Sequence, residues 1–244
     1  MGVAQGAYGR GCVSSDLAVV GIGRMGYAEA LELQRRLAHA RIAKRVPTDM
    51  LLLVEHPPVV TLGRSAQERH LITAPDVLAA RGIEVHEIER GGDVTFHGPG
   101  QLVGYPIYDL TEHKKDLHWF LRQIEGSLIA ALATLGLQAE RDARFTGVWT
   151  ERRKIASIGI HVKQWVTWHG FALNVSTDLT YFDLIVPCGI DGVVMTTITR
   201  ELGARTPRDV WARAIDAVVL GFAETFAQQP RMVTAEALLD EREA

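Results

Sequence analysis

The chain has 244 residues, of which 47% are hydrophobic, and its 26 basic and 29 acidic side chains give a formal net charge of -3. This composition suffices for one globular domain with a full core, and it excludes a disordered or fibrous chain. Charges of both signs are interspersed, so no basic surface for nucleic acid is expected. No apolar run approaches the roughly 20 residues that cross a bilayer, and the first residues lack the apolar segment of a signal peptide. We therefore expect a soluble, cytoplasmic protein that binds neither nucleic acid nor membrane.

Helical and strand-like segments alternate in the first half of the chain. A helix is expected over Tyr27–Lys44, with Pro47 bounding it downstream. A second, short helix is expected over Ala74–Arg81, ended by Gly82. Strands are expected over Met50–Glu55, Val59–Leu62, Ile83–Ile88, Asp93–His97 and Gln101–Ile107.

A glycine-rich segment, Arg90–Leu102, lies among these strands. Glycine pairs beside β-branched and aromatic residues cost conformational entropy, so they are expected where a ligand or another chain passes close to the backbone. The segment therefore predicts a binding site between paired strands.

The second half opens with a long amphipathic helix over Asp116–Leu135, stopped by Gly136. Strands are then expected over Gly147–Thr150, Lys154–Val162 and Trp165–Val175. A last helix is expected over Pro207–Ala227, with Thr206 as N-cap. This order, without repeats or low-complexity linkers, predicts a single α+β domain in which helices flank a mixed β-sheet.

The cysteines are Cys12 and Cys188, too few for a disulfide framework and not spaced as a zinc-binding pair. Cys188 lies between Pro187 and Gly189, and it is either a small buried hydrophobic residue or a nucleophile. Lys154 leads into a buried strand, where its side chain either reaches solvent or meets Cys188. In the second case its charge favours the thiolate, and it can shuttle a proton during acyl transfer.

Three histidines, His56, His97 and His169, have glycine or proline neighbours. Each by itself is typical of a hydrogen-bonded structural imidazole. No His/Glu pair has the helical spacing of a metalloprotease, so we expect no metal. The sequence also contains neither the Gly-x-x-x-x-Gly-Lys-Ser/Thr motif of phosphate-binding loops nor the Gly-x-Ser-x-Gly motif of serine hydrolases.

Several motifs together resemble those of the lipoyl(octanoyl) transferases, also called lipoate-protein ligase B. The resemblance covers about Tyr27 to Gly203. The motifs are Glu55–Pro58 with Thr61–Arg64, Arg90–Gln101 with Tyr105–Pro106, Lys154–Ala156 with Ile158–Gly159, His169–Asn174, and Pro187–Ile190.

The resemblance implies the catalytic fold of the biotin and lipoate protein ligases, in a domain spanning 20–228, with 1–19 and 229–244 unassigned. It also implies an acyltransferase without cofactor, in which Cys188 takes the octanoyl group from octanoyl acyl carrier protein as a thioester. Lys154 lowers the pKa of Cys188 and moves the proton. The acceptors are a lysine of the lipoyl domains of 2-oxoacid dehydrogenase E2 subunits and of the glycine-cleavage H protein, in the first step of endogenous protein lipoylation.

By the same matching, two sides of an acyl tunnel are expected, with His56 and His169 as supporting residues. One side comprises Arg90, Gly91, Gly92, Asp93, Val94, Thr95, Phe96 and His97, and the other comprises Ser157, Ile158, Gly159, Gly170, Phe171 and Ala172. A basic patch for the acidic partner proteins is expected at Arg141, Arg144, Arg152 and Arg153. The alternatives are an ATP-dependent lipoate or biotin protein ligase on the same fold, and a catalytically silent binding module.

Overall fold

The computed structural model describes residues 15–240, so Cys12 lies outside the described residues. Its main feature is a seven-stranded mixed sheet. In spatial order the strands are β10 (Gln229–Met232), β1 (Asp16–Arg24), β2 (Asp49–Glu55), β6 (Gln101–Ile107), β9 (Val166–Asn174), β8 (Arg153–Lys163) and β7 (Val148–Thr150). The first three run parallel to one another, and the pairs from β2 to β7 are antiparallel.

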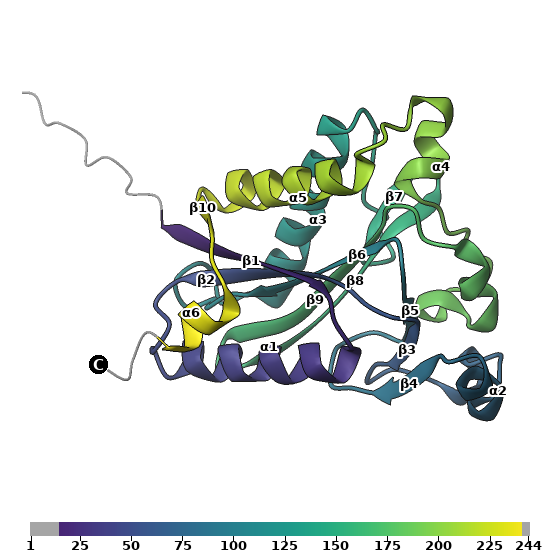
Figure 1. Cartoon of the computed structure of the whole chain (residues 1–244), viewed down its shortest axis with the longest axis horizontal. Helices are drawn as coiled ribbons and strands as arrows, with labels where there is room; N and C mark the ends of the chain where they lie inside the picture. The colour runs from purple at the N-terminus through teal and green to yellow at the C-terminus, as the bar shows by residue number, and fades with distance from the viewer. Residues whose placement is uncertain (1–14, 241–244) are drawn as a thin grey trace, which may run out of the picture.

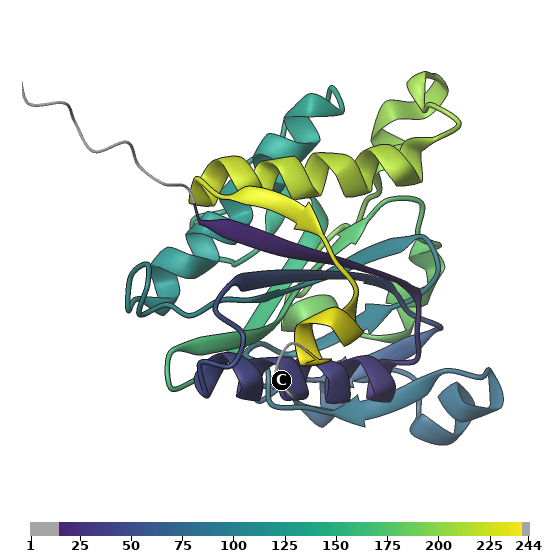
Figure 2. The ribbon, with the colours of Figure 1, turned by 60° about the vertical axis from the view of Figure 1, so that its left-hand side comes forward.

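Helices cover both faces of this sheet (Figures 1 and 2), with α1 (Tyr27–Ile42) below it and α3 (Leu117–Thr134) and α5 (Val210–Phe226) above it in Figure 1. Strand β2 shows why both faces are apolar. Leu51 and Leu53 pack in the cluster that contains α3 and α5, whereas Met50 and Leu52 pack on the α1 side. A strand buried on both faces reads as a continuous apolar run. The expected mixed sheet flanked by helices is confirmed.

A second, three-stranded sheet has the order β4 (Glu84–Glu87), β3 (Val59–Leu62), β5 (Val94–His97). It lies beside the main sheet with α2 (Pro75–Ala80) at its outer side (Figure 1). The remaining short helices are α4 (Ile198–Leu202), α6 (Ala235–Asp240) and the 3-10 turns η1 (Glu68–His70), η2 (Leu179–Leu184), η3 (Pro187–Gly189) and η4 (Gly203–Arg205).

Strands β1 and β10 reach past the domain limits expected at 20 and 228, because Asp16 pairs with Gln229. One expected helix boundary differs from the structure. The last helix begins at Val210 rather than Pro207, with Asp209 at its N-cap position, so the expected N-cap at Thr206 is wrong. The hydroxyl of Thr206 instead donates to the carbonyl of Gly203 at 2.8 Å in the preceding turn.

The long helix α3 begins as expected. The carboxylate of Asp116 accepts a hydrogen bond of 3.0 Å from the backbone N–H of Trp119, which satisfies one of the unpaired donors of the first turn. Within residues 15–240, no helix combines the length and the apolar character needed to span a bilayer.

Candidate active site

Lys154 and Cys188 meet, although 34 positions separate them in the sequence. Lys154 lies at the start of β8, where its backbone N–H donates to the carbonyl of Val194 at 2.8 Å and its carbonyl accepts from Thr196 at 2.9 Å. Its side chain is buried, and Nζ donates to Sγ of Cys188 at 3.2 Å. No carboxylate in the described chain lies within ion-pairing distance of this ammonium. The sulfur of Cys188, as a thiolate, is therefore the group that can balance the charge of Lys154.

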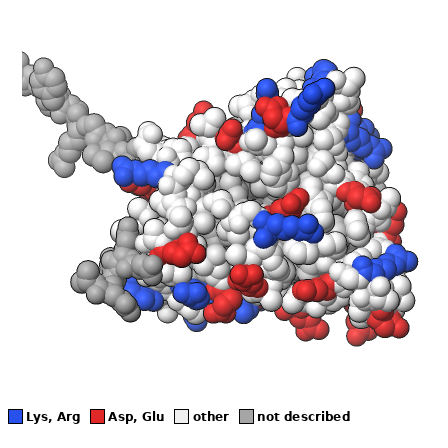
Figure 3. Space-filling view, viewed as in Figure 1, with Lys and Arg blue, Asp and Glu red and all other residues white. Residues whose placement is uncertain are grey.

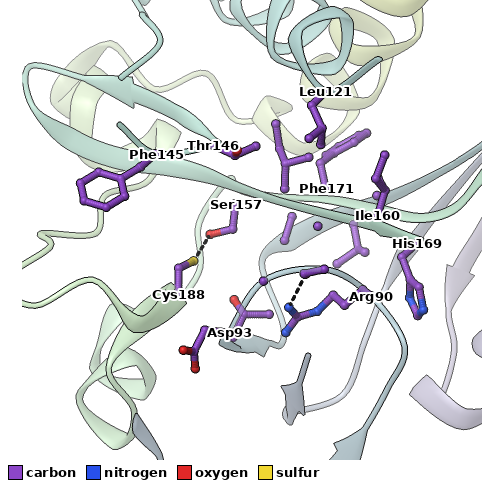
Figure 4. A pocket seen from close by; sticks show the side chains of 18 of the residues that line it. Arg90, Asp93, Leu121, Phe145, Thr146, Ser157, Ile160, His169, Phe171 and Cys188 are labelled. Carbon is purple, nitrogen blue, oxygen red and sulfur yellow. Dashed lines mark hydrogen bonds between the residues drawn. The ribbon is translucent and has the colours of Figure 1, made fainter. Parts of the chain in front are cut away.

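The backbone of Cys188 has an unusual conformation. It lies in η3 with φ of 58° and ψ of 17°, in the left-handed region that non-glycine residues rarely occupy. Strained residues of this kind concentrate at functional sites, where the surrounding structure holds them. Here the turn directs the thiol toward β8, where Oγ of Ser157 lies 3.4 Å from Sγ (Figure 4).

These contacts change the acidity of the thiol. Burial raises the pKa of Cys188, but the charge of Lys154 and the hydrogen bonds from Ser157 and Lys154 lower it by more. The net pKa lies below the ordinary value, so a larger fraction of Cys188 is thiolate at neutral pH. The thiolate is the nucleophilic form of cysteine.

A cavity of about 380 Å³ adjoins this pair and lies between the main sheet and the glycine-rich segment. Its volume falls in the range of small-molecule sites, about 300–1,000 Å³. Figure 4 shows Cys188 on one side of the cavity and Arg90 and His169 further along it. The lining includes all expected residues of β8 and β9, which are Ser157, Ile158, Gly159, Gly170, Phe171 and Ala172.

The glycine-rich segment lines the cavity only in part. Asp93, Thr95 and His97 border the cavity, as do Arg90, Gly91 and Gly92, whereas Val94 and Phe96 pack into the core beside Leu78. Successive side chains of a strand point to opposite faces, so β5 cannot present all its residues to one ligand. The expectation that Val94 and Phe96 line the tunnel is therefore wrong.

Arg90 holds the glycine-rich segment in place. Its buried guanidinium donates to the carbonyl and the hydroxyl of Thr61 at 2.8 and 2.9 Å, and to the carbonyl of Gly91 at 3.1 Å. Gly91 in turn donates to the carbonyl of Ile160 on β8 at 2.9 Å. The two sides of the cavity are thus joined by a backbone hydrogen bond.

The three histidines are buried, and burial lowers the pKa of each imidazole. His56 does not line the cavity; it lies between the carbonyl of Met25 at 2.8 Å and the hydroxyl of Tyr105 at 2.7 Å. Burial lowers its pKa to about 4. His97 borders the cavity with Nδ1 2.9 Å from the side-chain oxygen of Gln101, and burial lowers its pKa to about 3.

His169 also borders the cavity, with its backbone in the left-handed region at φ of 57°. Its backbone N–H donates to the side-chain oxygen of Gln34 at 2.9 Å, which joins β9 to α1. Burial lowers the pKa of this imidazole as well. His169 thus lines the cavity itself, whereas His56 contacts the lining residue Tyr105.

The expected basic patch is largely neutralised. Arg153 pairs with Glu201 at 2.7 Å, Arg141 pairs with Glu125 at 3.2 Å, and Arg144 pairs with Asp142 at 3.3 Å. Of the expected four, only Arg152 is without an acidic partner among the described residues. The face in Figure 3 likewise carries basic and acidic side chains interspersed. Acidic partners thus balance three of the four arginines of the expected basic patch.

Sequence reasoning missed several lining residues. Tyr27 and Tyr105 border the cavity, as do Leu121 of α3 and the loop residues Phe145 and Thr146. The apolar stripe of α3 was a signal for Leu121, because such a stripe must face the core. His70, which contacts Asp93, carried no sequence signal at all.

Known proteins are similar to this chain in sequence and in fold. Residues 26–220 match the family described as lipoyl protein ligase A/B catalytic domain. An octanoyltransferase from Gloeobacter violaceus is 55% identical over 168 residues, covering 69% of this chain and 73% of the relative. One from Acidobacterium capsulatum is 45% identical over 221 residues, covering 85% and 89%.

Among solved structures, a lipoate-protein ligase A bound with ATP superimposes with a TM-score of 0.68 at 19% identity, over 94% of each chain. At that identity the similarity establishes the fold alone. The family match and the sequence identities establish more: the chain belongs to the lipoyl protein ligase A/B catalytic domain family, in which these curated relatives are octanoyltransferases.

Proposed function

We propose that the protein transfers an octanoyl group through a thioester on Cys188. The observation that carries this proposal is the 3.2 Å contact between the buried ammonium of Lys154 and the sulfur of Cys188 at the edge of a cavity. A lowered thiol pKa supports it, because it provides the attacking thiolate. The octanoyltransferase relatives support the choice of acyl group.

The first half-reaction takes the octanoyl group from octanoyl acyl carrier protein. The Cys188 thiolate forms a C–S bond to the carbonyl carbon, and the bond to the thiol of the donor breaks. Lys154 gives its proton to the departing thiolate and becomes an amine. The products are an acylated Cys188, a neutral Lys154 and a free carrier thiol.

The second half-reaction passes the group to a lysine of a lipoyl domain of a 2-oxoacid dehydrogenase E2 subunit or of the glycine-cleavage H protein. The acceptor releases one proton to solvent, and its amine forms a C–N bond to the carbonyl carbon. The C–S bond to Cys188 breaks, and the second proton passes to the amine of Lys154. The thiolate–ammonium pair is restored, and no ATP is needed because an amide is more stable than a thioester.

The cavity holds the acyl chain in this proposal. Gly91 and Gly92 let the chain lie against backbone on one side, while Ser157 to Gly159 and Gly170 to Ala172 contact it on the other. The histidines beside it stay uncharged at neutral pH, which suits an apolar ligand. The protein uses no cofactor or metal, and it works in the cytoplasm, where cysteines stay reduced.

The test is transfer in a defined mixture of the protein, octanoyl acyl carrier protein and a lipoyl domain, without ATP. We expect one octanoyl amide on the acceptor lysine, seen by intact mass. The Cys188→Ala variant is expected to give none. Transfer that requires ATP and free octanoic acid would instead make the protein a ligase, and binding of both partners without any product would make it a binding module.

A further inference from the structure

The acceptor lysine reaches the site as an ammonium, which has no free electron pair to attack the thioester. Its ammonium, with a pKa near 10.4, is almost fully protonated at neutral pH. Acylation removes the negative charge of Cys188, while the guanidinium of Arg90 remains beside the cavity. An ammonium that enters this site needs a compensating anion.

Among the described residues that line the cavity, Asp93 is the only acid. It lies directly against the turn that carries the nucleophile: a Cβ added to Gly189 would lie 2.6 Å from Oδ2 of Asp93. In Figure 4 Cys188 lies between Ser157 and Asp93. The carboxylate is therefore adjacent to the position of the acyl thioester.

The carboxylate is also held in a fixed orientation. Its Oδ1 accepts a hydrogen bond of 2.7 Å from the backbone N–H of Val94, and its Oδ2 accepts one of 2.7 Å from Nδ1 of His70. The guanidinium of Arg69 donates to Nε2 of His70 at 3.3 Å, which assigns the His70 proton to Nδ1.

His70 links this carboxylate to the nucleophile turn. Its carbonyl accepts a hydrogen bond of 2.7 Å from the backbone N–H of Val186, one residue before η3. A carboxylate has about four acceptor sites, and two are occupied here, so Asp93 retains capacity for a further donor. Although buried, it borders the cavity, where that donor can arrive.

We propose that Asp93, positioned by His70, binds the ammonium of the acceptor lysine beside the acylated Cys188. The proposal rests on the proposed function, because it concerns the second half-reaction. The carboxylate hydrogen-bonds the ammonium and brings its nitrogen to the carbonyl carbon. The ammonium then releases one proton to solvent and attacks as the amine.

The test separates the two half-reactions. Wild-type protein and Asp93→Asn are first acylated with octanoyl acyl carrier protein, and the acyl-enzymes are then mixed with a lipoyl domain or with hydroxylamine, an uncharged nucleophile. We expect Asp93→Asn to acylate at the wild-type rate and to react normally with hydroxylamine. Its reaction with the lipoyl domain is expected to slow by about 10- to 100-fold, the effect of losing one hydrogen bond to a charged group.

Equal slowing with both nucleophiles, slowed acylation, or no slowing at all would overturn the proposal. Failure of the wild-type protein to form an acyl-enzyme would instead contradict the proposed function. Asp191→Asn is the matched control, because Asp191 is exposed three positions after Cys188 and does not line the cavity. We expect it to match the wild type in every step.

If Asp93→Asn does not fold, two further comparisons test the role of this carboxylate. His70→Ala is expected to slow only the step with the lipoyl domain, and His70→Gln, whose amide can still donate to Asp93, to recover part of the rate. A lipoyl domain whose target lysine is replaced by arginine should inhibit transfer from the wild-type acyl-enzyme to an unaltered lipoyl domain. Its inhibition constant should be at least tenfold lower than that of a lipoyl domain with methionine at this position, as expected for a charged hydrogen bond. Equal inhibition by the two domains would contradict an anionic lysine site.

Discussion

The two ends of the cavity differ in charge. At the Cys188 end, a buried ammonium and a thiol of lowered pKa form a polar pair with Asp93 beside them. At the other end, His97 and His169 are buried and uncharged, and the ring of His97 stacks on Tyr27 with centroids 5.9 Å apart. The Cys188 end thus holds a paired charge, whereas at the other end two imidazoles of lowered pKa lie near the guanidinium of Arg90 (Figure 4).

This difference has a physical cause. An isolated buried charge is costly, so a buried ionisable group is neutral unless a partner compensates it. Lys154 has such a partner in Cys188, but His97 has only the neutral amide of Gln101. Lys154 therefore keeps its charge beside an ionisable partner, whereas the guanidinium of Arg90 is held by neutral acceptors, the carbonyl and the hydroxyl of Thr61.

The largest effect is expected from removing the ammonium. In Lys154→Met the thiol loses its main compensating charge and its proton carrier, so kcat for octanoyl transfer should fall by about 10²- to 10⁴-fold. The pH profile of Cys188 alkylation by iodoacetamide should also shift to higher pH. Lys163→Met is the control, because Lys163 is exposed at the other end of β8. An unchanged alkylation profile in Lys154→Met would show that Lys154 does not set the acidity of the thiol.

The second effect concerns the backbone of the nucleophile turn. Gly189 has φ of 65°, and a Cβ there would lie 2.6 Å from Oδ2 of Asp93. Gly189→Ala therefore combines left-handed strain of about 1–2 kcal/mol with displacement of the turn, and a displacement of about 1 Å can lower kcat about 10²-fold. Gly192→Ala is the matched control, because Gly192 has φ of 70° and no atom within 4 Å of its Cβ position.

In urea unfolding, Gly192→Ala should lose about the cost of left-handed strain alone, and Gly189→Ala should lose more, because its Cβ also meets Asp93. Only Gly189→Ala should lose most of its transfer rate. Equal rates in the two variants would mean that the position of the turn does not matter for catalysis.

The third prediction concerns the pKa of His97. The pKa of His97 is about 3 in the folded protein and about 6.5 in the unfolded chain. The unfolded chain then binds more protons below about pH 6.5, so stability falls as pH decreases toward 3, by about 2 kcal/mol at about pH 5 from this residue. Between about pH 7 and pH 5, the free energy of unfolding of His97→Gln should fall by about 2 kcal/mol less than that of the wild type.

Urea unfolding at the two pH values measures this difference. His118→Gln serves as the control, because His118 is exposed on α3. If His97→Gln loses as much stability as the wild type, His97 is not held neutral by burial.

The smallest effect is expected at the surface. Arg152 is exposed between β7 and β8, and exposed charges contribute little, about 0–1 kcal/mol. Arg152→Gln should raise KM for the carrier-protein donor by about two- to threefold at low salt, and the difference should vanish as salt screens the charge. Arg231→Gln, on β10 at the opposite edge of the sheet, should leave KM unchanged.

Local patterns in the sequence were sufficient for much of the fold. The apolar stripe and the stop at Gly136 predicted α3, and continuous apolar runs predicted β2 and β6, because these signals are contained in single segments. The strand pairing of Asp16 with Gln229 was not predictable, because it joins the two ends of the chain.

The site was predictable where a family motif marked it. Lys154 and Cys188 were singled out from their motifs, and the structure places them in contact. The alternation of β5 was overlooked, so Val94 and Phe96 were assigned to the tunnel although they face the core. The role of His70 could not be predicted from the sequence, because only the folded chain brings it to Asp93.

The acylation of Cys188 is the central claim and can be measured directly. The intact mass is recorded after incubation with octanoyl acyl carrier protein, without ATP and without an acceptor. We predict a gain of one octanoyl group that hydroxylamine removes and that Cys188→Ala does not acquire. No adduct on the wild-type protein, or the same adduct on Cys188→Ala, would contradict a thioester at Cys188.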